Sequence, residues 1–162
     1  MATMNFMKVD GADGDSNDQG HKNWIDIEPF SISASNQGSF AIGSGGNVGG
    51  ADHHDLTIHA VLDKAMPVIF YQLATGDTVP TVKLEACKMS NKKQVVFESV
   101  ELKNVMFTGI NTGSGTSANG QPMVTYTFTY ESIKKEYTPL KADGNPGAKV
   151  TAGWNAAKNI KL

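Results

Sequence analysis

The chain has 162 residues, a formal net charge of −2 at pH 7 and a pI near 6.0. This length predicts a single domain over 1–162, and the charge excludes the strongly basic surface of proteins that bind nucleic acid or anionic membranes. No apolar run approaches the roughly 18 residues needed to cross a bilayer, and MATMNFMKVD lacks the basic and apolar regions of a secretory signal. We therefore expect no membrane insertion and folding in a cytoplasm. The single cysteine, Cys87, agrees because it excludes an internal disulfide framework.

The first half of the chain alternates apolar and polar residues, which is the pattern of half-buried strands. Residues 2–9 predict a first strand, 22–34 a second extended stretch and 54–62 a third strand. Pro29 has no backbone N–H to donate, so we expect a bend or an edge position there.

The segment DGADGDSNDQGHKNWIDI, residues 10–27, is rich in carboxylates and raises the question of a calcium loop. Counted from Asp13, the third and fifth positions carry oxygen ligands of the EF-hand type. The sixth position is Asp18 where glycine is required, and the twelfth is Trp24, which offers no oxygen. Asp, Asn, Ser and Gly favour turns for local reasons. The sequence predicts a surface loop without calcium.

Residues 36–52 (NQGSFAIGSGGNVGGAD) contain six of the 17 glycines. The stretch is too rich in glycine for a core strand and too long for a tight hairpin, and loops of this length are usually functional or disordered. Phe40 and Ile42 are apolar and need a partner. We expect an extended loop that docks onto another chain.

A short helix is predicted over 67–75, because Pro67 is favoured at the first helical position and Gly76 as a C-terminal cap. The alternation of apolar residues then predicts strands at 81–87, 94–110 and 124–130.

Two changes of apolar parity interrupt these later strands. The first lies between Phe97 and Val100 and predicts a bulge or a division into two strands. The second predicts a kink near Ser132.

Many strands with one short helix predict a mainly β fold, namely a closed or nearly closed antiparallel barrel or sandwich with the helix on its flank. Residues 111–121 are expected to form a polar loop. Residues 138–162 are expected to form an irregular tail with an apolar pin at Trp154.

No active site, cofactor or metal site is predicted from these patterns. His53, Asp55 and His59 share a strand parity, but Asp55 and His59 are separated by about 13 Å of extended chain and cannot share one ion. Neither glycine-rich stretch forms a nucleophile elbow or a phosphate-binding loop. Cys87 has no histidine near it in the sequence, so a structural thiol is favoured over one with a histidine partner brought near by the fold.

Three stretches stand in order along nearly the whole chain: VDGADGDSNDQGHKNWIDIEPFSIS, then LDKAMPVIFYQLATG, then FTYESIKKEYTPL followed by AGWNAAKN. Their distinctive residues are Gly14, Asp15, Ser16, Asp18, His21, Trp24, Ile25, Asp63, Lys64, Pro67, Phe128, Tyr130, Glu136, Tyr137, Gly153 and Trp154. Together these stretches resemble the haemolysin-coregulated protein (Hcp) family, the tube protein of bacterial type VI secretion.

The resemblance implies a compact antiparallel β-barrel of two packed sheets with one short flanking helix, and no enzymatic activity. It implies hexameric rings that stack into a tube inside a contractile sheath and beneath a valine-glycine-repeat spike. The tube is assembled in the bacterial cytoplasm and secreted, with effector proteins in its lumen. The 36–52 loop resembles the family's extended loop, which reaches from one ring to the next. The inter-ring or inter-subunit contacts expected are Gly38, Phe40, Ile42, Asn47, His53 and His54.

The chain also departs from the family's pattern. Asp15 stands where Glu is common, Ile32-Ser33 where a Trp-Gly pair is common, and Met66 where a small helix cap is common. Two other classes of protein remain as alternatives. A metal- or calcium-dependent β-sandwich binding module predicts loss of stability with a chelator, and a hydrolase predicts an apolar cleft with a perturbed titratable group.

Overall fold

The computed structural model describes residues 3–39, 47–116 and 120–162, with the side chains of 37–39, 47–51, 114 and 115 also outside the description. The elements, in chain order, are β1 Met4–Val9, β2 Ile25–Ile27, β3 Ala34–Ser39, β4 Asn47–His53, β5 Leu56–Val61, α1 Ala65–Thr75, β6 Val79–Ser90, β7 Lys93–Thr116, β8 Pro122–Tyr137, β9 Val150–Asn155 and β10 Ile160–Lys161. Within the described ranges no helix is both long and apolar enough to cross a membrane.

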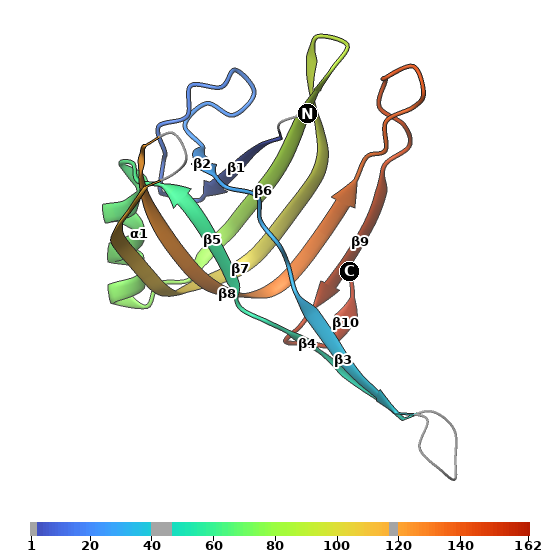
Figure 1. Cartoon of the computed structure of the whole chain (residues 1–162). Coiled ribbons are helices and arrows are strands. Elements are labelled where there is room, and N and C mark those ends of the chain that lie inside the picture. Colours follow the sequence, from blue (N-terminus) through green and yellow to red (C-terminus); the bar gives the residue numbers. More distant parts are fainter. Residues whose placement is uncertain (1–2, 40–46, 117–119) are drawn as a thin grey trace.

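Six antiparallel strands close into a barrel in the order β8-β5-β2-β1-β6-β7, because β7 pairs back onto β8. The long strand β8 makes this closure possible. Its first half pairs with β5 and its second half pairs with β9, while β7 follows its other edge. Figure 1 shows the barrel with α1 on its flank and with β9 and β10 continuing the sheet beyond β8. The predicted antiparallel barrel is confirmed.

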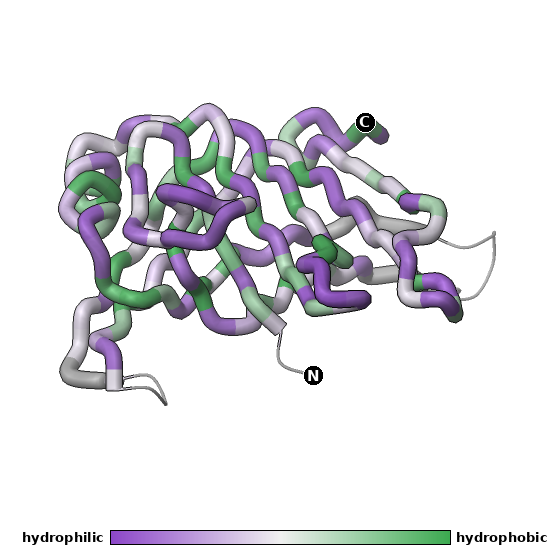
Figure 2. The backbone as a smooth tube through the Cα atoms, turned by 90° about the horizontal axis from the view of Figure 1, so that it is seen from above, coloured by the Kyte–Doolittle hydropathy of each residue, from purple (hydrophilic) through white to green (hydrophobic). Residues whose placement is uncertain are grey.

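The core follows from the alternation along the strands, which Figure 2 shows as apolar and polar stretches that succeed one another. In β8, Val124, Tyr126 and Phe128 are buried while the threonines between them are more exposed. Phe107 of β7 packs on both of these aromatic rings, with centroids 6.0 and 5.2 Å away. The largest fully buried side chains are Tyr126, Phe128, Met7, Ile25, Leu56, Ile58, Ile69, Leu84 and Leu102.

The parity change after Phe97 is a β-bulge, which is one of the two alternatives that the sequence predicted. Cys87 pairs with Val96 and Ala86 pairs with Glu98, so Phe97 is the extra residue opposite β6. The strand therefore continues without a break through both parities.

The helix begins at Ala65, two residues before the expected start, and ends at Thr75. The N-cap residue is Lys64, whose side chain makes no capping bond; the Asp63 carboxylate just before it accepts the Ala65 N–H at 3.0 Å and so caps this first-turn donor, which the sequence pattern missed. Pro67 then lies in the first turn, where its missing N–H costs nothing. Gly76 ends the helix with φ of 70°, a conformation that only glycine adopts without strain.

The expectation of an irregular tail over 138–162 is wrong, because β9 and β10 lie within it. The strand β9 pairs with the half of β8 that β5 leaves free. The second extended stretch shortens to β2, and most of the loop expected over 111–121 belongs to β7. The side chains of 111–116 and 150–155 alternate weakly, so it is backbone pairing with β8 that makes these segments strands.

Candidate functional site

A two-stranded ribbon formed by β3 and β4 projects away from the barrel (Figure 1). The pairing runs from Ala34–His53 to Ser39–Asn47, with a bulge between Asn36 and Gly38. It forms a sheet of its own, with no strand pairing to the eight-stranded sheet in the described residues. A lone two-stranded hairpin is only marginally stable in water, so a ribbon of this kind gains from packing against a further surface.

The base of the ribbon contains two adjacent histidines, of which His53 contacts the barrel and His54 contacts the β3 side of the ribbon. His53 packs edge-on against the Tyr130 ring of β8 with centroids 6.1 Å apart, and the Tyr130 hydroxyl lies 3.5 Å from His53 Nδ1. His54 lies on the solvent side, with Nε2 3.1 Å from the Ser35 hydroxyl and its N–H donated to the Ser33 carbonyl at 3.3 Å. The side chains thus fix the direction in which the ribbon leaves the barrel.

Four of the six residues expected to contact another subunit map to this ribbon or its base. Gly38 pairs with Val48 and Asn47 with Ser39, while His53 and His54 form the base. Phe40 and Ile42 lie outside the described residues. Their contact with a second chain stays a prediction.

A second surface, unlike the ribbon, lies at the end of the sheet that β9 and β10 form. Exposed apolar side chains lie on both faces of these strands: Tyr137 (53% exposed) pairs with Val150 (65%) on one face, and Ile160 (50%) and Leu162 (57%) lie on the other. The strand β10 has two residues and one paired neighbour, so it leaves a short free edge. Exposed apolar groups at a free edge favour contact with another chain.

The acidic loop is held as a structural connection between β1 and β2. Its two halves pair through backbone bonds from Gly14 N–H to the Asn23 carbonyl at 2.8 Å and from Ser16 N–H to the Trp24 carbonyl at 3.0 Å. Among the described residues, no carboxylate of this loop belongs to a group of three or more side chains placed to share a metal ion.

The loop is joined to the helix by Asp63. This carboxylate accepts hydrogen bonds from the Asp15 and Ala65 N–H groups at 3.2 and 3.0 Å. Burial raises the pKa of Asp63 above its ordinary value, in spite of the hydrogen bonds that favour the charged form. The Asp-Lys-x-x-Pro motif is therefore a junction between the loop and the start of the helix.

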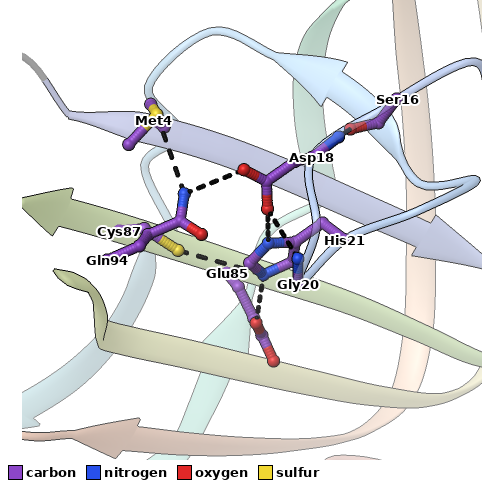
Figure 3. A network of polar contacts seen from close by, with 8 residues as sticks. All are labelled: Met4, Ser16, Asp18, Gly20, His21, Glu85, Cys87 and Gln94. Atoms are coloured by element: carbon purple, nitrogen blue, oxygen red, sulfur yellow. Dashed lines mark hydrogen bonds and ion pairs between the residues drawn. The ribbon is translucent and has the colours of Figure 1, made fainter.

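His21 forms the densest polar cluster of the loop (Figure 3). Its Nδ1 lies 2.8 Å from Asp18 Oδ2 and its Nε2 lies 2.6 Å from Glu85 Oε2. Its ring stacks on Phe6 with centroids 4.1 Å apart and 8° between the planes. Cys87 Sγ lies 3.9 Å from Nε2.

The sequence offered Cys87 no nearby histidine, yet the fold brings His21 beside it. The strand pattern indicated only part of this cluster: Glu85 and Cys87 are two residues apart on β6 and therefore share a face. Burial, assisted by the negative charges of Glu85 and Asp18, raises the pKa of the Cys87 thiol to about 12. A thiol held protonated and fully buried is a poor nucleophile, so the arrangement does not make a cysteine-histidine catalytic pair.

These features define a small antiparallel β-barrel with a projecting ribbon and a free apolar edge. Residues 6–137 match the family model described as "Type VI secretion system effector, Hcp". The chain is 30% identical over 162 residues to Protein hcp1 of Pseudomonas aeruginosa, covering 99% of each chain. It belongs to the Hcp family of type VI secretion proteins, as the sequence motifs predicted.

Solved structures agree with the family assignment. The chain is similar to one described as the structure of a type six secretion system protein, with a TM-score of 0.90, 28% identity and coverage of 99% of this chain and 100% of that one. Hcp1 from Salmonella typhimurium, at 22% identity, shares the fold with a TM-score of 0.81 over 100% of both chains.

Proposed function

We propose that this chain is a structural subunit of the type VI secretion inner tube. It assembles into hexameric rings that stack, acts without enzymatic activity, and is exported from the bacterial cytoplasm with the spike protein by the contractile sheath. The lumen of the rings carries or chaperones effector proteins. Family membership over residues 6–137 supports this role, and the projecting ribbon is the observation that carries it.

The two exposed surfaces favour a ring over a two-fold dimer. A cyclic ring needs a heterologous interface, in which one surface of each subunit meets a different surface of the next, whereas a two-fold dimer needs one self-complementary surface. The polar ribbon and the β9–β10 edge with its exposed apolar side chains are unlike each other, so neither is paired with a copy of itself by this proposal, and the ribbon is assigned to contact between rings. The ribbon, which extends beyond the barrel, suits contact with a neighbouring ring.

The ring is tested by light scattering on the size-fractionated protein, with and without a chelator. A species near six times the 17.3 kDa chain, unchanged in mass by the chelator, is expected. A monomer at all accessible concentrations refutes the ring, and a monomer that unfolds on chelation favours the metal-dependent binding module instead. A concentration series is needed because assembly follows mass action.

Stacking is tested separately by replacing residues 37–49 with an Asn-Gly turn and imaging the protein at high concentration by electron microscopy. The parent is expected to form stacked rings, and the shortened variant single rings with the same number of subunits. Tyr71→Ala on α1 is the control, because Tyr71 is exposed and α1 lies on the flank of the barrel in Figure 1, away from the ribbon. Tubes formed equally by the shortened variant would exclude the ribbon as the stacking element.

A further inference from the structure

Three side chains of different chemistry converge where the acidic loop meets β6. His21 Nε2, Glu85 Oε2 and Cys87 Sγ all lie within 4.8 Å of one another (Figure 3). Imidazole, carboxylate and thiolate are the three ligand types that zinc takes in proteins. Two residues come from one strand and the third from a loop more than sixty residues earlier, so only the folded chain assembles the set.

The two distances from His21 Nε2 fit a tetrahedral ion after small movements. Ordinary zinc bond lengths place a nitrogen and an oxygen ligand about 3.4 Å apart, and a nitrogen and a sulfur ligand about 3.5 Å apart. Nε2 of His21 is now 2.6 Å from Glu85 Oε2 and 3.9 Å from Cys87 Sγ. Glu85 must withdraw by about 0.8 Å and the sulfur must approach by about 0.4 Å, which side-chain rotation supplies.

The histidine is already oriented as a zinc ligand would be. Its other nitrogen, Nδ1, lies 2.8 Å from Asp18 Oδ2, which reproduces the carboxylate-histidine pair that stands behind zinc sites. Asp18 is itself fixed, because Oδ2 accepts the Gly20 N–H at 3.2 Å and Oδ1 accepts Gln94 Nε2 at 3.3 Å. Nε2 therefore points at Glu85 and Cys87 from a ring with little freedom to turn.

We propose that His21, Glu85 and Cys87 bind a Zn²⁺ ion, with Asp18 as the positioning residue behind His21 and water as the fourth ligand. The thiolate and imidazole select zinc over calcium and magnesium, which take oxygen ligands.

Binding replaces the proton of the Cys87 thiol by the ion, because the thiolate is the form of cysteine that coordinates metals. Lys83 Nζ stays 3.4 Å from the other oxygen of Glu85, so that oxygen remains paired.

The proposal is tested on the full chain after removal of metal with a chelator. Cobalt(II) is added as the probe and the thiolate-to-cobalt charge-transfer absorption is recorded. Because the chain has one cysteine, this band reports on Cys87 alone. We expect the band in the parent, its loss on addition of zinc, and one zinc ion per chain by native mass spectrometry.

Four variants separate a built site from adventitious binding. Cys87→Ala and His21→Gln are expected to abolish the band and the bound ion, and Asp18→Asn to weaken zinc affinity about 10- to 100-fold. His54→Gln, an exposed histidine on the ribbon base, is the control and should bind as the parent does. Circular dichroism on each variant shows that it is folded.

Two results overturn the proposal. One is a parent that shows no cobalt band and retains no zinc in native mass spectra. The other is zinc bound with the same affinity by the Cys87→Ala variant, which places the ion elsewhere. The first result is measured on the parent protein alone, so it can be obtained even if a variant does not fold. The mass of the assembled ring is a separate quantity and does not enter either result.

Discussion

A methyl group added to Gly14 tests whether the acidic loop is built by close backbone contact with β2. A Cβ at this position would lie 2.4 Å from the Trp24 carbonyl oxygen and 2.8 Å from Asp63 Oδ2. Gly14 also donates its N–H to the Asn23 carbonyl at 2.8 Å, so the loop cannot move away without breaking that bond.

The cost follows from the contacts that must open. Separating the two halves of the loop breaks one or two backbone hydrogen bonds at about 1 kcal/mol each. It also displaces Asp63, which caps the helix, and a lost cap costs about 1 kcal/mol. Gly14→Ala is therefore expected to lower the free energy of unfolding by about 2–3 kcal/mol.

Gly76→Ala is the matched control because it adds the same methyl group at a glycine that is needed for its positive φ and not for close contact. Gly76 has φ of 70° and no atom within 4 Å of its added Cβ, so it carries conformational strain without a collision. Its expected cost is about 1 kcal/mol.

Urea unfolding at one fixed protein concentration, followed by circular dichroism, measures both variants. Gly14→Ala should lose at least about twice as much stability as Gly76→Ala. If Gly14→Ala lies within about 1 kcal/mol of the parent, or is milder than Gly76→Ala, the close-contact explanation is refuted.

Two further predictions concern buried titratable groups. The folded-state pKa of Asp63 lies above its ordinary value of 3.8, so its contribution to stability is present below that value and is lost as the pH rises through the folded pKa. Urea unfolding of Asp63→Asn and of the parent measures this effect. Between about pH 3.5 and pH 7, the stability of the variant relative to the parent should increase. A decrease would show that hydrogen bonding outweighs burial. Because burial raises the pKa of Cys87 to about 12, the metal-free native protein should resist alkylation by iodoacetamide at pH 8 and react only when urea unfolds it. Rapid labelling of the native chain would contradict the buried, protonated thiol.

Local pattern was sufficient for much of the barrel. The alternation of Val124, Tyr126, Phe128 and the threonines between them predicts a strand because side chains of a strand point to opposite faces. The helix end at Gly76 follows from one residue that adopts positive φ freely. The ordered motifs predicted the Hcp family, which the family match confirms.

Tertiary structure decided the features that local pattern does not encode. The segment VTAGWN alternates weakly and becomes β9 only because β8 outlasts β5 and offers unpaired N–H and C=O groups along its edge. Residues 36–52 are too rich in glycine to specify a register, yet backbone pairing makes parts of them β3 and β4. His21 reaches Glu85 and Cys87 because the loop folds over β6, and no spacing within one segment records a contact between segments so far apart in the chain.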